Sequence, residues 1–113
     1  MQDIKEIYEE MGILIKNMED EDAVQEVKEG YEVFDKNTKI LLEAHNMEDF
    51  LEKYEALCKS ENGVLECFDL SNADDLKVYI EQNNIDFDEL KLVTAQTSYA
   101  VLENLVYEAE EEY

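Results

Sequence analysis

The sequence predicts an all-α protein, a compact bundle of about five helices around a central C-terminal helix. Apolar residues recur at alternating steps of three and four, which is the spacing of one face of a helix. Proline is absent and there are only three glycines, so little interrupts long helices. A chain of 113 residues with 45% hydrophobic residues can build one modest core, which predicts a single acidic helical domain over 1–113.

Two amphipathic helices are predicted in the first part of the chain. Asp3 can cap the first. Its buried face consists of Ile4, Ile7, Met11, Leu14 and Met18. The second carries a heptad seam of Val24, Val27, Tyr31, Phe34, Thr38, Leu41 and His45. Gly30 lies within it, costs about 1 kcal/mol relative to alanine and could allow a kink. The alternative for residues 31–42 is a β-hairpin, but the unbroken seam favours a helix.

The middle of the chain predicts a third helix followed by a break. Asn46 can cap this helix. Its buried face consists of Met47, Phe50, Tyr54 and Leu57. Residues 60–63, SENG, are a turn signal, and at most a short extended segment follows near 64–68.

Two further helices complete the bundle. Ser71 followed by Asp74 is a variant of the capping box and predicts the start of the fourth helix. Its buried face consists of Leu76, Tyr79 and Ile80. The last helix is predicted from about 87 to 110. It is apolar on several sides, which indicates a central position, through Leu90, Val93, Ala95, Tyr99, Val101, Leu102, Leu105, Val106 and Ala109.

The charge of the chain restricts its partners. Thirty-one acids oppose nine lysines, for a net charge of −22, far beyond the value of about 2 to 8 that solubility needs. Nucleic acid and anionic membranes would repel such a protein, so neither is expected as a direct partner. A basic protein is the natural counterpart. Adaptation to high salt is the alternative, and the two-to-one excess of Glu over Asp argues against it.

Known signals for secretion, redox chemistry and catalysis are missing from the sequence. The amino terminus has no basic region followed by an apolar stretch, and no apolar run approaches membrane-spanning length, which predicts a cytoplasmic protein. Cys58 and Cys67 form no CxxC pair, so reduced thiols are favoured over a disulfide. The single histidine, His45, has no nucleophile or orienting partner nearby, and a position near a helix end explains it.

No metal or cofactor site is predicted either. Residues 83–93 resemble the second half of a calcium-binding EF-hand loop. However, with Glu89 as the closing ligand, Val78 and Ile80 would occupy ligand positions. Neither a Cys/His cluster for zinc nor a glycine-rich phosphate loop is present. We therefore expect a protein that is not an enzyme and carries no cofactor.

The candidate partner-binding residues are acids on helix faces together with nearby tyrosines. Carboxylates three or four residues apart on a helix lie about 5–6 Å from each other, close to the scale on which phosphates follow one another along nucleic acid. The predicted residues are Asp20, Glu21, Asp22, Glu26, Glu29, Tyr107, Glu108, Glu110, Glu111, Glu112 and Tyr113.

The two acidic runs in this set differ in their local explanation. Acids at 19–22 can cap the second helix and meet the positive end of its dipole. Acids at 108–112 crowd the negative end of the last helix, where the dipole disfavours them. The second run therefore either frays into a solvated tail or is kept for a partner.

In composition the whole chain resembles a class of small, very acidic inhibitors made by phages and mobile elements. These include antirestriction proteins, anti-CRISPR proteins and glycosylase inhibitors that mimic DNA. The resemblance implies a non-enzymatic inhibitor that occupies the basic groove of a nuclease or other nucleic-acid-binding protein. One alternative is an immunity protein or antitoxin that neutralises a basic toxin. Another is an acidic helical adaptor or oligomerisation module, which would allow a homodimer.

Overall fold

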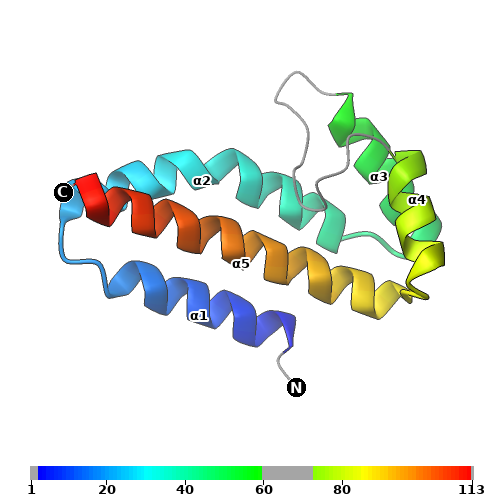
Figure 1. Cartoon of the computed structure of the whole chain (residues 1–113), viewed down its shortest axis with the longest axis horizontal. Coiled ribbons are helices and arrows are strands. Elements are labelled where there is room, and N and C mark those ends of the chain that lie inside the picture. The colour runs from blue at the N-terminus through cyan, green and yellow to red at the C-terminus, as the bar shows by residue number, and fades with distance from the viewer. Residues whose placement is uncertain (1–2, 60–72, 113) are drawn as a thin grey trace.

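The computed structural model describes residues 3–59 and 73–112, and within these ranges it contains five helices (Figure 1). They are α1 (Ile4–Lys16), α2 (Glu21–Leu42), α3 (Met47–Cys58), α4 (Ala73–Gln82) and α5 (Phe87–Glu112). The all-α prediction is therefore confirmed. The extended segment expected near 64–68 and the expected cap Ser71 lie outside the described residues.

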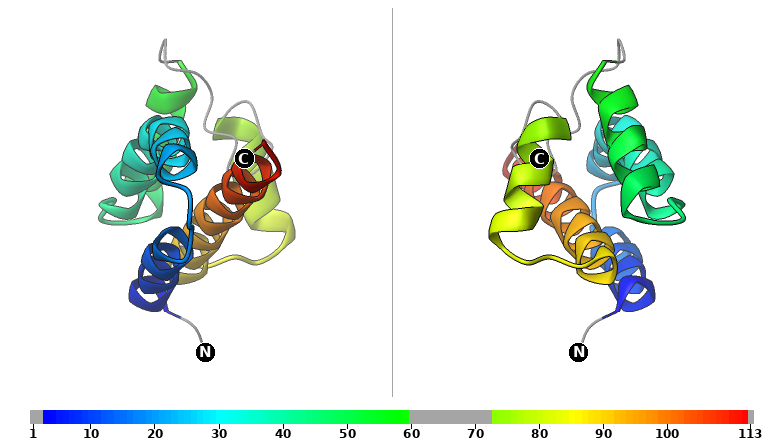
Figure 2. Two further views of the ribbon diagram at one scale, coloured as in Figure 1. Left: turned by 90° about the vertical axis from the view of Figure 1, so that its left-hand side faces the viewer. Right: turned by 90° about the vertical axis from the view of Figure 1, so that its right-hand side faces the viewer.

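Helix α5 is the centre of the bundle, as the sequence predicts. α1 and α2 pack along α5 on different sides, with α1 running parallel to it and α2 antiparallel (Figures 1 and 2). α3 and α4 pack on each other, and α3 also packs on α2. This pair covers the end of the molecule where α5 begins (Figure 1).

The buried side chains form two clusters. The three-helix core joins α1, α2 and α5 and consists of Ile7, Met11, Ala23, Val27, Tyr31, Ala95, Leu102, Val106 and Ala109. The α3–α4 core consists of Leu41, Ala44, Phe50, Tyr54, Leu57, Leu76, Ile80 and Leu90. Phe34 is half-buried and packs against both.

Buried polar residues stand between the two cores in the sequences of α2 and α5. Thr38 and Thr94 are completely buried, and each hydroxyl returns to its own helix. Thr38 Oγ1 donates to the carbonyl of Phe34 at 2.9 Å, and Thr94 Oγ1 donates to the carbonyl of Leu90 at 2.7 Å. The hydroxyls of Tyr31 and Ser98 hydrogen-bond each other across α2 and α5. These bonds satisfy polar groups that burial would otherwise penalise.

The helix starts follow local rules. Asp3, Asn46 and Asp86 each accept a hydrogen bond at 2.8 Å from the backbone N–H three residues later, as N-cap residues do. The predictions for Asp3 and Asn46 are confirmed. At the end of α4, Asn84 adopts a left-handed φ of 51°, and the N–H of Ile85 donates to the carbonyl of Ile80. This is the hydrogen bond of a Schellman-type helix end.

Two features predicted for α2 are decided by the structure. Residues 31–42 are continuous helix, so the alternative β-hairpin is wrong. The extension of the seam to His45 is also wrong, because α2 ends at Leu42 and His45 is exposed in the connection to α3. Ala44 takes the buried position instead, since the chain turns there to begin α3.

Two other side chains differ from their predicted places. Met18 is half-buried but lies beyond the end of α1, so it packs from the loop and not from the helix face. Tyr79 is 38% exposed, whereas Leu76 and Ile80 are buried as predicted. α4 packs mainly on α3, and a narrow contact of this kind needs only the i and i+4 positions.

Candidate partner-binding surface

The two acidic runs of the sequence meet at one end of the molecule. Because α2 runs antiparallel to α5, the start of α2 lies beside the end of α5 (Figure 1). A depression of about 340 Å³ there is lined by Asn17, Met18, Glu19, Asp20, Ala23 and Glu110. We call this surface the acidic end and define it by Glu19, Asp20, Glu21, Asp22, Glu26, Glu108, Glu110 and Glu111.

Asp20 has a structural role at the acidic end. It is the N-cap of α2, and its Oδ1 accepts hydrogen bonds from the backbone N–H groups of Asp22 at 2.9 Å and Ala23 at 3.1 Å. Glu21 and Asp22 occupy the first turn, where the positive end of the dipole favours negative charge. Capping therefore explains Asp20, while Glu21 and Asp22 stay exposed to solvent.

The other part of the acidic end is the last stretch of α5, which stays helical through Glu112. Val106 and Ala109 are buried and hold this stretch on the three-helix core. The neighbouring carboxylates of Glu108, Glu110 and Glu111 are exposed, and Tyr107 is 62% exposed. The run therefore does not fray over the described residues. The side chain of Glu112 and the whole of Tyr113, also predicted for this site, lie outside them.

Antiparallel packing partly explains why acids are tolerated at the end of α5. The negative end of the α5 dipole lies next to the positive end of the α2 dipole (Figure 1). Glu110, which shares a depression with Asp20, thus faces the amino-terminal end of α2. This compensation comes from a neighbouring helix and is invisible to local sequence reasoning.

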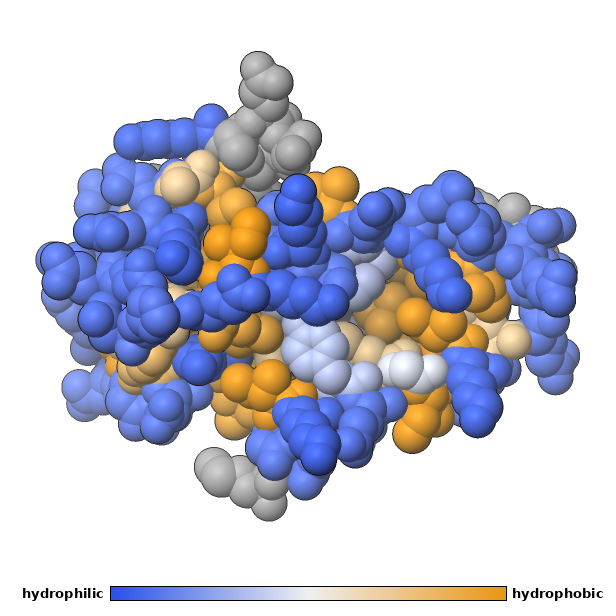
Figure 3. Space-filling view, turned by 180° about the vertical axis from the view of Figure 1, so that it is seen from behind, coloured by the Kyte–Doolittle hydropathy of each residue, from blue (hydrophilic) through white to orange (hydrophobic). Residues whose placement is uncertain are grey.

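The predicted partner-binding residues do not all lie at the acidic end. Glu29 is exposed further along α2, outside the acidic end. Glu29 accepts a hydrogen bond from Gln25 Nε2 at 3.0 Å and lines a separate depression of about 350 Å³ between α1 and α2, together with Ile15 and Tyr31. On the face opposite to that of Figure 1, apolar surface shows between rows of hydrophilic side chains (Figure 3).

Lysines are few at the acidic end, where Lys16 closes the last turn of α1 (Figure 1). The sequence has no lysine from 17 to 27 and none after Lys91. Within 3–59 and 73–112, three ion pairs with i, i+4 spacing lie in the second half of α2 and along α3 up to its C-cap: Lys39–Asp35, Lys53–Asp49 and Lys59–Glu55. The eight acids of the acidic end therefore far outnumber the lysines near them.

Sequence reasoning missed a continuation of this surface along α1 and α5. The pKa of the Tyr99 hydroxyl is raised by burial and, further, by the carboxylates of Glu103 and Glu10. Heptad spacing assigned Tyr99 to the core, and the structure leaves it half-buried. The effect of Glu103 could have been predicted, because it lies four residues after Tyr99 on the same helix. The approach of Glu10 from α1 has no signal in the sequence.

Other candidate chemistries receive little support from the described residues. His45 is exposed, and its backbone N–H donates to Asp49 Oδ2 at 2.9 Å. Burial raises the pKa of the half-buried Cys58 thiol, while Cys67 lies outside the described part. Among the residues that the structure describes, no group of three or more His, Cys, Asp and Glu could hold a metal ion. No helix in those ranges combines the length and apolar character needed to cross a membrane.

Comparison with known proteins identifies no family for this chain. No protein-family model, curated protein or solved structure matches it. The arrangement of its own residues is therefore the basis for the function proposed below.

Proposed function

We propose that this protein is a non-enzymatic inhibitor of a basic nucleic-acid-binding protein or nuclease, and that its acidic end takes the place of nucleic acid. The observation that supports the proposal is the convergence on one surface of two acidic runs, neither of which contains a lysine. Carboxylates held about 5–6 Å apart on rigid helices can pair with the lysine and arginine side chains that normally contact phosphates.

Tyr107 supplies the apolar part of this interface. It is 62% exposed and is followed directly by the acids of the last turns. Aromatic residues are enriched among the side chains that dominate binding energy, so Tyr107 is the proposed anchor. Within this proposal, the composition supports an anti-defence inhibitor of the kind that phages or mobile elements make, such as an anti-CRISPR or antirestriction protein.

The test begins with capture of partners from host lysate on the immobilised full chain, at about 0.05 M and 0.5 M salt. A recovered nuclease or nucleic-acid-binding protein is then purified and titrated with the chain in the presence of a duplex oligonucleotide. The proposal expects competition with the oligonucleotide and a steep loss of affinity with salt. A partner that binds equally at both salt concentrations and ignores the oligonucleotide would instead indicate an antitoxin.

Matched variants separate the acidic end from general negative charge. Glu108→Gln, Glu110→Gln and Glu111→Gln together remove three charges from the acidic end. Glu43→Gln, Glu52→Gln and Glu81→Gln remove three exposed charges from the opposite end. We expect the first triple variant to bind at least about tenfold more weakly than the second. Equal loss in both would show that net charge alone drives binding.

A further inference from the structure

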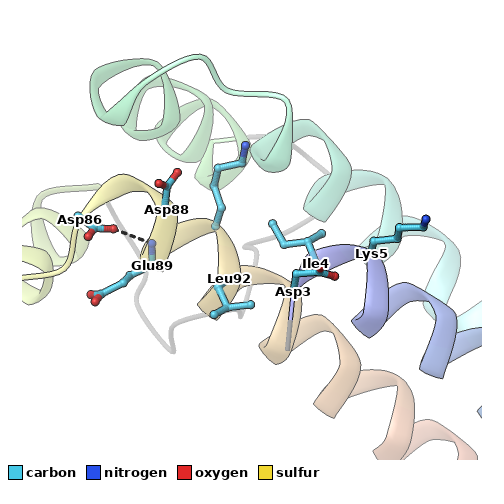
Figure 4. A pocket seen from close by; sticks show the side chains of 8 residues that line it. Asp3, Ile4, Lys5, Asp86, Asp88, Glu89 and Leu92 are labelled. Carbon is cyan, nitrogen blue, oxygen red and sulfur yellow. Dashed lines mark hydrogen bonds between the residues drawn. The ribbon is translucent and has the colours of Figure 1, made fainter. Parts of the chain in front are cut away.

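A groove lies between the amino-terminal ends of α1 and α5, away from the acidic end (Figure 4). Its volume is about 620 Å³, larger than the depressions of about 340 Å³ and 350 Å³ described above. It forms because α5 is longer than α1 and extends beyond its start, so that α1 leaves the first turns of α5 uncovered (Figure 1). The lining residues are Asp3, Ile4, Lys5, Asp86, Asp88, Glu89, Lys91 and Leu92.

The apolar part of the groove is formed by Ile4 of α1 and Leu92 of α5. Both side chains are half-buried, and both pack against the three-helix core. Because they rest on a packed core, they form a fixed apolar surface that remains in contact with solvent. A volume of about 620 Å³ is within the range of ligand-binding pockets.

The charges around this surface favour a cationic occupant. The amino ends of two helices would ordinarily attract an anion. Here Asp3 and Asp86 already cap these ends through hydrogen bonds of 2.8 Å to Glu6 N and Glu89 N. The next two acids, Asp88 and Glu89, are exposed in the first turn of α5. The groove therefore presents carboxylate oxygens where an empty helix end would present N–H groups.

The two lysines of the lining do not cancel this negative charge. The Lys91 ammonium lies 5.3 Å from the centre of the Phe87 ring, where it makes a cation–π contact. Lys5 is exposed and its side chain points away from the carboxylates of α5 (Figure 4). The four acids of the lining thus outnumber its two lysines, and only Lys5 points away from the acids of α5 (Figure 4).

We propose that this groove is a docking site for a basic, amphipathic segment of a partner protein. An apolar side chain of the segment packs on Ile4 and Leu92, and a neighbouring lysine or arginine pairs with Asp88 and Glu89. The site is distinct from the acidic end, so it does not depend on nucleic-acid mimicry. It gives the chain a second contact that recognises apolar and basic groups together.

The test uses two synthetic peptides with equal charge, acetyl-Leu-Arg-Leu-Arg-Leu-amide and acetyl-Ser-Arg-Ser-Arg-Ser-amide. Each is titrated into the ¹⁵N-labelled full chain, and the backbone amide shifts are followed. We expect the leucine peptide to shift the amides of residues 3–5 and 86–92 in a saturable way. The serine peptide should bind there about tenfold more weakly, because it lacks the apolar contacts.

Surface variants check the charged part without disturbing the core. Asp88→Asn with Glu89→Gln should weaken binding of the leucine peptide about three- to tenfold. The matched pair Glu52→Gln with Glu81→Gln, exposed carboxylates of α3 and α4, should leave it unchanged.

Several results would overturn the proposal. They are equal affinity for both peptides, shifts that are largest at 19–26 and 108–111, or equal effects of the two variant pairs. Spermidine serves as a third probe, because it carries charge without apolar side chains. If spermidine shifts residues 3–5 and 86–92 as strongly as the leucine peptide, the groove is a polyamine site and the proposal of a protein partner fails.

Discussion

The two ends of this molecule treat acidic side chains differently. At the α3–α4 end, Asp49 and Glu55 pair with lysines four residues later, and Asp49 also accepts a hydrogen bond from the His45 N–H. At the acidic end, Asp20 caps α2, and neither acidic run, 19–22 or 108–112, contains a lysine. The first arrangement stabilises helices, and the second concentrates charge. The comparison supports the proposal that the acids at the end of α5 are kept for a partner.

The largest expected effect tests whether the two ends also fold separately. Phe50 is completely buried in the α3–α4 core, so Phe50→Ala should lower the free energy of unfolding by about 3–5 kcal/mol. Phe50 belongs to the α3–α4 core, which meets the three-helix core at the half-buried Phe34. We therefore expect amide hydrogen exchange to accelerate in α3 and α4 more than in α1. Leu102→Ala, in the three-helix core, should produce the opposite distribution. Uniform acceleration in both variants would show one cooperative unit.

The next effect concerns the acids of α5. Replacing Glu108, Glu110 and Glu111 with glutamine removes negative charge from the negative end of the helix dipole, which is worth about 0.3–1 kcal/mol for each residue. The triple variant should therefore be more stable than the wild type at low salt, by urea unfolding. The gain should shrink as salt is raised, since screening already weakens the repulsion. A destabilised variant would contradict the view that these acids oppose folding.

A smaller effect is expected at the glycines of the long helices. A Cβ added at Gly30 would lie 3.7 Å from Leu105 Cδ2, an ordinary van der Waals contact, and one at Gly12 would meet nothing within 4 Å. Each change to alanine should therefore stabilise the protein by about 0.5–1 kcal/mol through helix propensity. Thermal unfolding measures both. If Gly30→Ala destabilises while Gly12→Ala stabilises, α2 and α5 need the closer approach that glycine permits.

The smallest expected effect is the pH dependence contributed by Asp49. The hydrogen bond from the His45 N–H and, further, Lys53 lower the pKa of this carboxyl below its ordinary value of 3.8. Since the folded pKa is the lower one, Asp49 contributes stability above the unfolded pKa, and this is lost as the pH falls through the folded pKa.

Asp49→Asn should therefore lose less stability than the wild type between about pH 5 and pH 2, in urea titrations at each pH. Glu52→Gln, an exposed carboxylate on the same helix, is the control. Identical pH profiles for the wild type and Asp49→Asn would exclude this contribution of Asp49.

Much of the fold was predictable because helices depend on nearby residues. The caps Asp3 and Asn46 and the buried pairs Phe50–Tyr54 and Leu102–Val106 follow from spacing and side-chain chemistry alone. Periodicity failed at Met18 and His45, where the three-and-four pattern continues past the last helical residue. Spacing does not encode where the chain turns, so these two residues were placed on helices that had already ended.

The candidate surface was predictable only as two separate lists of residues. The sequence by itself determined the helices, their caps, the excess of acid and the runs at 19–22 and 108–112. Only the tertiary structure decided that these runs share one end and that Glu110 lies beside Asp20. It also decided that the start of α1 and the first turns of α5 line one groove. The physical reason is that helix formation is local, whereas the direction in which helices pack depends on contacts between residues far apart in the chain.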